Sequence, residues 1–261
     1  MKFSIHQASH IGNRKYNQDR AAYCYNNEAI LLVLADGMGG HLNGEVAADM
    51  TITQFVSAFS TQRPLQDPLS FLSDTMRAAH QDIMGLPHKK DKTFPGTTCV
   101  AAVIQEGKLY WGYAGDSRLY VFRRGRIFTR TLDHSMVQMW LECGVIDEEE
   151  ARTHPRRHQI TNCLGGVEDM FEIEVAAPID LQSGDVIFLS SDGLHDPFLD
   201  KELAAAFAVS PVADALNKLL VRAVALEAGQ ADNATGVALR WGPDEPLHLT
   251  NDPVICVLEI K

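Results

Sequence analysis

The sequence predicts an α+β protein in which antiparallel sheets are covered by helices. Segments with the apolar or alternating pattern of strands fall in groups, and paired helical patterns fall between the groups rather than in strict strand–helix alternation. The chain has 261 residues, of which 46% are hydrophobic and 22% charged, so it has ample apolar material for one large core. These observations favour layered antiparallel sheets over a parallel βαβ sheet.

The first half of the chain is expected to form strands, then two helices, then further strands. Residues 3–9 alternate apolar and polar side chains, and residues 29–35 are the continuous apolar run of a buried strand. Helices are expected from the capping residue Asn43 to about residue 59, and over 68–84. The next strands are expected at 98–104, 108–114, 119–122 and 126–129.

The second half begins with a polar segment, residues 134–160, in which the acidic run 147–150 opens a short helix. After it we expect strands at 171–177, 185–191 and 234–241 and helices near 200–207 and 211–228. The domain is expected to span residues 1–242. Residues 243–261 are expected to form a C-terminal extension, with an added edge strand at its apolar residues 254–258.

Charge and composition exclude several classes of protein. The formal net charge of −11 argues against nucleic acid as a partner, because phosphate backbones are bound by clustered Lys and Arg. No run approaches the roughly 18 apolar residues of a membrane helix, and the first residues lack the features of a signal peptide. The five cysteines include no Cys-x-x-Cys pair, so no zinc ribbon or disulfide framework is indicated. We expect a cytoplasmic protein.

Aspartates recur at the ends of the expected strands. Asp36, Asp116 and Asp192 each follow an apolar run, Asp232 directly precedes the strand at 234–241, and Asp19 ends a polar segment. A single aspartate in such a place is typical of a turn or a helix cap. At Asp36 a hairpin turn is a poor interpretation, because a helix follows the Asp-Gly pair instead of a returning strand. A shared functional site is therefore indicated by the recurrence of aspartates at several strand ends, and not by any one of them.

If these carboxylates converge, cations must neutralise them. Two unit charges 4 Å apart repel by about 4 kcal/mol at an effective dielectric constant of 20. Oxygen ligands without thiolates or a histidine cluster select hard cations such as Mg²⁺ or Mn²⁺. Gly37 fits this interpretation, since a glycine lets a backbone carbonyl approach an ion closely.

Eight short motifs follow one another in a fixed order between about residues 3 and 241. They are Arg14-x-x-Asn17-Gln18-Asp19, Asp36-Gly37-Met38-Gly39-Gly40-His41, Gly96-Thr97-Thr98, Ala114-Gly115-Asp116-Ser117-Arg118, Asp133-His134-Ser135, Leu164-Gly165, Ser190-Ser191-Asp192-Gly193-Leu194 and Asp232-Asn233-x-Thr235. In this order they resemble the PPM family, the protein phosphatase 2C type, in its compact bacterial form. The resemblance implies an α-β-β-α sandwich of two antiparallel sheets flanked by helices, with metals in a cleft where the sheets meet.

The resemblance also implies the roles of individual residues. Six positions match the metal site: Asp36 as a bridge between two Mn²⁺ or Mg²⁺ ions, Gly37 through its carbonyl, Asp192 and Asp232 on the first metal, Asp19 through coordinated waters, and Asp116 with Asp192 at a third, weaker metal site. Arg14 matches the residue that binds the phosphate, and His41 is the candidate general acid. Residues 134–160 match the flap, a segment beside the site.

The activity implied is hydrolysis of phosphoserine and phosphothreonine in proteins by a water activated between two metals. Expected partners are phosphorylated proteins, those of a cognate Ser/Thr kinase, and the chain is expected to act as a monomer without nucleic acid or membrane. Two alternatives stay open: a pseudophosphatase that binds phosphoproteins without turnover, and a phosphohydrolase of small phosphate esters. No Cys-x5-Arg loop, Gly-x-Ser-x-Gly elbow, His-Glu-x-x-His helix or Gly-x4-Gly-Lys-Ser/Thr loop is present.

Four residues, at three places in the chain, depart from the family pattern. Gln18 replaces a common Glu and removes a negative charge near the second metal, and Asn162 with Cys163 replaces a frequent Arg-Ala pair. His195 stands where Thr or Trp is common. It is expected either to contact the Asp192 loop or to be an exposed surface histidine.

Overall fold

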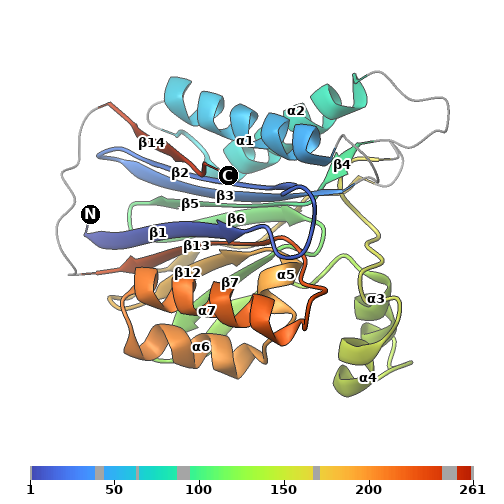
Figure 1. The fold of residues 1–261 in the computed structure, drawn as a ribbon. Coiled ribbons are helices and arrows are strands. Elements are labelled where there is room, and N and C mark those ends of the chain that lie inside the picture. Colours follow the sequence, from blue (N-terminus) through green and yellow to red (C-terminus); the bar gives the residue numbers. More distant parts are fainter. Residues whose placement is uncertain are drawn as a thin grey trace.

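Two antiparallel sheets stack face to face and carry helices on their outer faces, which confirms the predicted α-β-β-α sandwich (Figure 1). The structure is a computed structural model that describes residues 2–38, 44–62, 65–86, 95–166, 171–242 and 252–259. None of the helices in these ranges combines the length and the apolar character of a membrane-spanning segment.

The smaller sheet has five strands, all paired antiparallel. Their spatial order is β1 (Phe3–His10), β13 (Ala234–Trp241), β12 (Val186–Ser190), β7 (Arg118–Arg123) and β8 (Arg126–Arg130). The end of β12 lies beside the start of β13, since Ser190 is paired with Gly236. This register brings the residues after β12 and those before β13 to the same edge of the sheet.

The larger sheet has nine strands, which are also antiparallel. Its main path runs β10 (Glu174–Val175), β6 (Lys108–Ala114), β5 (Cys99–Gln105), β3 (Ala29–Met38), β2 (Asp19–Tyr25) and β14 (Val254–Val257), with β11 (Ile179–Asp180), β4 (Gly96–Thr97) and β9 (Leu164–Gly165) attached beside it. Strand β14 pairs with β2 at the edge of this sheet.

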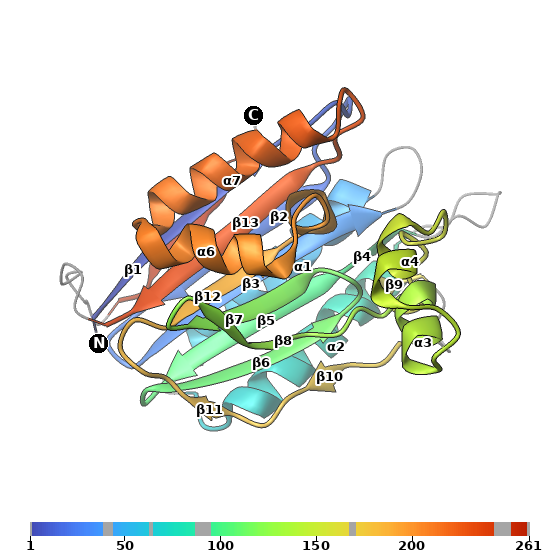
Figure 2. The same cartoon turned by 90° about the horizontal axis from the view of Figure 1, so that it is seen from below.

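Helices cover both outer faces and project from one end of the sandwich (Figures 1 and 2). They are α1 (Gly44–Thr61) and α2 (Pro68–Met84) over the larger sheet, α5 (Asp192–His195), α6 (Asp200–Val209) and α7 (Val212–Leu226) over the smaller sheet, and α3 (Met136–Glu142) and α4 (Glu148–Thr153) at the end. Helices α3 and α4 lie within the segment 134–160 that resembles the flap.

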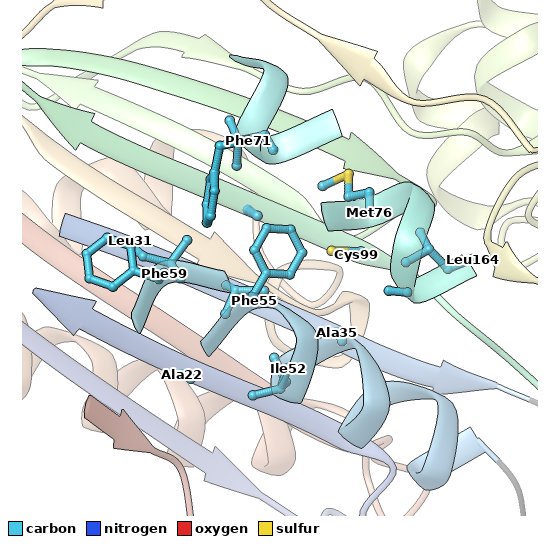
Figure 3. Close-up of a cluster of buried hydrophobic side chains, with 14 of the residues drawn as sticks. Ala22, Leu31, Ala35, Ile52, Phe55, Phe59, Phe71, Met76, Cys99 and Leu164 are labelled. Atoms are coloured by element: carbon cyan, nitrogen blue, oxygen red, sulfur yellow. The ribbon is translucent and has the colours of Figure 1, made fainter. Parts of the chain in front are cut away.

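The core has three layers, one between the sheets and one under each helical face. Strand β3 explains the continuous apolar run in the sequence, because its alternate side chains enter two of these layers. Leu31 and Val33 face α1 and α2, whereas Leu32 and Leu34 pack between the sheets. Figure 3 shows the layer under α1 and α2, where Phe55 and other side chains fill the space between the helices and the larger sheet.

Most of the expected elements are confirmed, but the strand expected at 171–177 is wrong in extent. Only Glu174–Val175 and then Ile179–Asp180 pair with β6 there. Pro178 lies between the two pairs, and a proline has no N–H to donate to a strand ladder. Strand β2 and helix α3 were not expected from the sequence. Asn43, the expected helix cap, lies outside the described residues.

Candidate active site

Helices α3 and α4 project from one end of the sandwich (Figure 1). A cavity of about 390 Å³ has a lining that includes His158 and Ile160, which follow α4 in the chain. Four of the five predicted aspartates line it: Asp36, Asp116, Asp192 and Asp232. Arg14 and Gly37 line it as well. The aspartates come from both sheets, so the structure brings together residues that are far apart in the sequence.

Asp36 is positioned by the backbone of β3 and its neighbours. Thr98 accepts a hydrogen bond from the Asp36 N–H through Oγ1 at 3.1 Å, and its own N–H donates to the Asp36 carbonyl at 2.8 Å. Thr97 Oγ1 donates to the same carbonyl at 2.8 Å. These hydrogen bonds hold the main chain of Asp36 near the end of β3, and none of them uses its carboxylate.

Asp19 lies opposite Asp36 on β2, behind the cavity wall, and is fully buried. Ser191 Oγ donates to its Oδ2 at 2.9 Å, whereas its Oδ1 has no hydrogen-bond partner among the described residues. A buried polar atom without a partner usually marks the place of a water or an ion. The position of Asp19 therefore suits the predicted contact through metal-bound waters.

Asp192 and Asp232 meet because β12 and β13 are antiparallel neighbours. Asp192 opens α5 directly after β12, and Asp232 directly precedes β13. The close approach requires Gly193: a Cβ there would lie 2.2 Å from the carbonyl oxygen of Asn233. Glycine at this position lets the two strand ends come together.

Asn233 holds the loop that carries Arg14 against the start of β13. Its Oδ1 accepts from the Gln18 N–H at 2.8 Å, and its Nδ2 donates to the carbonyls of Ile11 and Tyr16 at 2.8 and 3.1 Å. Arg14 Nη2 donates to Asp232 Oδ2 at 2.5 Å. The Arg14 side chain is 60% exposed and lines the cavity.

Gly37 is required where the end of β3 meets the start of α1. A Cβ on Gly37 would lie 2.2 Å from the carbonyl oxygen of Gly44 and 2.8 Å from that of Gln18. The backbone of Gly37 is buried beside the cavity, which is compatible with the predicted use of its carbonyl. His41, the candidate general acid, follows within residues 39–43 and lies outside the described residues.

Asp116 lies at the turn after β6, where Gly115 adopts a φ of +110°. A left-handed φ of this kind favours glycine. Burial raises the pKa of Asp116 well above its usual value, and the charge of Asp192 raises it further. Asp116 and Asp192 both line the cavity, where the resemblance places the third metal site.

His158 and Asp196, which lie beside Asp192, were not predicted. His158, in the segment after α4, places Nδ1 3.4 Å from Asp192 Oδ2 and 3.9 Å from Asp196 Oδ2. Burial raises the pKa of Asp196 to about 6, with Asp192 adding to the effect. Asp192 opens α5 and Asp196 is its C-cap, and this spacing of four residues could have indicated that they share a face. Nothing in the sequence indicates that His158 folds over them.

The structure shows the contacts of Gln18, Asn162 and His195, which depart from the family pattern. Gln18 Nε2 donates to Glu45 Oε2 at 3.3 Å at the start of α1. Asn162 makes two hydrogen bonds with the main chain of Glu172. Its Nδ2 donates to the carbonyl at 2.7 Å, and its Oδ1 accepts from the N–H at 3.2 Å. His195 is only 1% exposed, so the expectation of an exposed surface histidine is wrong. It contacts the Asp192 loop through Asp196, at 3.4 Å.

The electrostatics of the cavity suit divalent cations. Burial raises the pKa of Asp36 well above its usual range, and repulsion by Asp19, Asp192, Asp116 and Asp232 adds to this. Burial likewise raises the pKa of Asp19 to about 7. Carboxylates that repel one another in this way bind hard cations through oxygen, and the donor set contains no thiolate. The residues present therefore fit Mg²⁺ or Mn²⁺.

A four-layer sandwich with a carboxylate-lined cavity at the end of its sheets is the architecture of a metal-dependent phosphatase. Residues 6–225 match the family model of protein phosphatase 2C, and the chain belongs to this family.

Known relatives include bacterial protein phosphatases. The protein phosphatase PhpP of Streptococcus pneumoniae is 31% identical over 230 residues, which cover 86% of this chain and 92% of PhpP. The serine/threonine protein phosphatase PstP of Mycobacterium tuberculosis is 35% identical over 227 residues, covering 84% of this chain and 43% of PstP, so this chain matches less than half of that relative. A crystal structure of the PstP catalytic domain with two manganese ions has a TM-score of 0.77 at 30% identity, covering 92% of this chain and 98% of that domain.

Proposed function

We propose that this chain hydrolyses phosphoserine and phosphothreonine in proteins with the help of two divalent cations, Mn²⁺ or Mg²⁺. The observation that carries the proposal is the convergence of Asp36, Asp192 and Asp232 on one cavity, with Asp19 buried behind them. The similarity to bacterial protein phosphatases, one of them solved with two manganese ions, supports it.

Each carboxylate of the cavity has a place in the proposed metal site. Asp36 and the carbonyl of Gly37 would hold the second metal, and Asp36, Asp192 and Asp232 the first. Asp19 would hold waters through its unpartnered Oδ1, and Asp116 with Asp192 would hold a third metal more weakly. When bound, the metals lower the pKa of water and neutralise the charge of the phosphate.

Arg14 and His41 are proposed to act on the phosphate ester itself. The planar guanidinium of Arg14 has five N–H donors, so its contact with Asp232 leaves donors for phosphate oxygens. That contact also holds the guanidinium beside a proposed metal ligand. His41 stays our candidate for protonating the leaving serine or threonine oxygen.

The identity of the substrate proteins and the boundaries of the domain are further proposals. We propose that the substrates are the phosphoproteins of a cognate Ser/Thr kinase and that the chain acts as a cytoplasmic monomer. We also propose that residues 1–242 form the phosphatase domain and that the extension 243–261 adds the edge strand β14 to it.

The proposed function is tested by phosphate release from a phosphothreonine peptide, with and without Mn²⁺, in wild type and in Asp192→Asn. We expect turnover that requires Mn²⁺ and falls at least about a hundredfold in the variant, because Asp192 is a proposed metal ligand. Asp180→Asn is the matched control, since Asp180 is 83% exposed and pairs with Lys108 away from the cavity. It should keep wild-type activity.

Two outcomes of this assay would favour the alternatives. A wild-type protein that binds Mn²⁺ tightly but releases no phosphate would be a phosphoprotein-binding pseudophosphatase. A rate on small phosphate esters that far exceeds the rate on any phosphopeptide would make the chain a small-ester phosphohydrolase.

Replacing Arg14 with Ala should raise KM for phosphopeptides about tenfold or more and change kcat less. The reason is that a charge-assisted fork to the phosphate contributes about 1.5–3 kcal/mol to binding. Arg14→Lys keeps the charge but loses the planar fork, so it should restore KM only in part. Steady-state kinetics of the three proteins tests this, and an unchanged KM in Arg14→Ala would remove Arg14 from phosphate binding.

A further inference from the structure

A second cavity of about 400 Å³ lies between the flap helices α3 and α4 and the start of α6, and we call it the flap groove. Figures 1 and 2 show these two helices projecting from the sandwich, so the groove lies between a projecting element and the main body. Its apolar wall includes Val137 and Leu141 of α3 and Phe198 before α6. The phosphatase chemistry proposed above uses none of these residues.

The charges of the flap groove differ from those of the whole chain. Five basic and four acidic side chains line it, although the formal net charge of the chain is −11. Arg118 is paired with Asp133 at 2.6 Å, and Arg130 with Asp200 at 3.2 Å. These two pairs are internally neutral, so the remaining side chains decide what the groove can bind.

Three basic side chains of the groove, Arg152, Arg157 and Lys201, have no carboxylate within salt-bridge distance among the described residues. Arg152 Nη1 donates to the carbonyl of Phe198 at 3.4 Å, which leaves its charge unpaired. Opposing them are Glu148 and Asp196, and Asp196 faces His158. The groove therefore has an apolar wall and one more basic than acidic side chain.

The flap groove and the active site are linked by shared lining residues through a third cavity. Arg157 and Asp196 line both the flap groove and a third cavity of about 290 Å³. That third cavity shares Arg14, Asp192 and Asp232 with the active site. A peptide whose phosphate lies at Arg14 would pass Arg157 to reach the groove, and an extended chain advances roughly 3.3 Å per residue.

We propose that the flap groove binds an acidic segment of the phosphoprotein substrate, a few residues away from the phosphorylated serine or threonine. Arg152, Arg157 and Lys201 pair with Asp or Glu side chains of that segment, and the apolar wall packs against a neighbouring side chain. Charge complementarity selects an acidic segment over a neutral or basic one. The inference rests on the proposed function, because the phosphate in the active site fixes the register of the peptide.

The test compares phosphothreonine peptides that differ only in charge. Two Asp, two Ala or two Lys residues are placed two to five positions before or after the phosphothreonine, and kcat/KM is measured for the full chain with Mn²⁺. We expect one placement of the Asp pair to raise kcat/KM roughly fivefold over the Ala peptide, mainly through KM. The gain should shrink as ionic strength rises.

Variants then assign the effect to the groove. Arg152→Gln with Lys201→Gln should abolish the preference for the Asp peptide, and Arg157→Glu should invert it towards the Lys peptide. An inverted preference cannot result from a damaged fold. Arg77→Ala is the matched control, because Arg77 is exposed on α2 and lines none of the three cavities. It should keep the preference of the wild type.

Two results would overturn the inference: equal kcat/KM for Asp, Ala and Lys peptides at every placement, or a preference for Asp that survives both groove variants. Either result leaves the proposed function intact as long as Mn²⁺-dependent hydrolysis is seen. Failure of the proposed function is recognised separately, by the lack of Mn²⁺-dependent phosphate release from all peptides and from p-nitrophenyl phosphate.

Discussion

Replacing Asp36 with Asn should lower Mn²⁺-dependent kcat/KM by at least about a thousandfold and, at the same time, raise the stability of the metal-free protein. The loss follows from the proposed bridging role, since charge stabilisation by metals is worth several kcal/mol and each 1.36 kcal/mol is a factor of ten in rate. The gain follows from the site itself. Burial and four neighbouring aspartates raise the pKa of Asp36, so its ionised form destabilises the metal-free fold.

The two effects are measured on the same preparations. Urea unfolding in the presence of a chelator at pH 7.5 gives the free energy of unfolding, and phosphate release with Mn²⁺ gives kcat/KM. Asp180→Asn serves again as the control and should change neither, because Asp180 is exposed. A variant that keeps a tenth of the activity, or one whose metal-free form is clearly less stable than wild type, would contradict the assignment of Asp36.

A lower kcat/KM together with a higher free energy of unfolding would show that the Asp36 carboxylate serves the activity and not the fold. The backbone of Asp36 is held by Thr97 and Thr98, and these hydrogen bonds do not involve its carboxylate. An Asn side chain can therefore replace the carboxylate without disturbing β3. A site that destabilises its own fold until cations bind is a common cost of function.

The sequence predicted the layers of the fold because burial on both faces leaves a clear pattern. The run 29–35 is apolar throughout because β3 lies in the middle of the larger sheet, between two core layers. Strand β2 was missed because its residues, Asp19–Tyr25, mix charged, small and aromatic side chains without clear alternation. Its strand conformation depends on pairing with β3, which is a tertiary effect.

The aspartates of the site could be predicted, whereas the residues that come from the flap could not. Asp36 lies near the end of β3, and Asp116 and Asp192 follow β6 and β12, so the sheets place all three. His158 reaches Asp192 only because the segment after α4 folds back, a placement that leaves no periodic signal in the sequence. The burial of His195 likewise depends on packing, here against Tyr120.

The metal-free protein should lose stability as pH rises from about 4 to about 7. The pKa of Asp19 is about 7 in the folded protein, chiefly because the carboxyl is buried, against 3.8 for an ordinary Asp. The folded state therefore binds more protons than the unfolded state between these values, and the free energy of unfolding falls with increasing pH. A shift of about three pKa units corresponds to about 4 kcal/mol at most, at 1.36 kcal/mol per unit.

Urea unfolding in chelator at pH 5, 6, 7 and 8 checks this, with Asp19→Asn beside the wild type. Asn carries no titrating group, so the variant should show a shallower decline, and the remaining slope belongs to the other buried carboxyls such as Asp116. Saturating Mn²⁺ should reverse the trend in the wild type, because metals bind the deprotonated carboxylates and stabilise the fold more at higher pH. Identical slopes in the two proteins would show that Asp19 is ionised in the metal-free fold and that its burial is compensated by other groups.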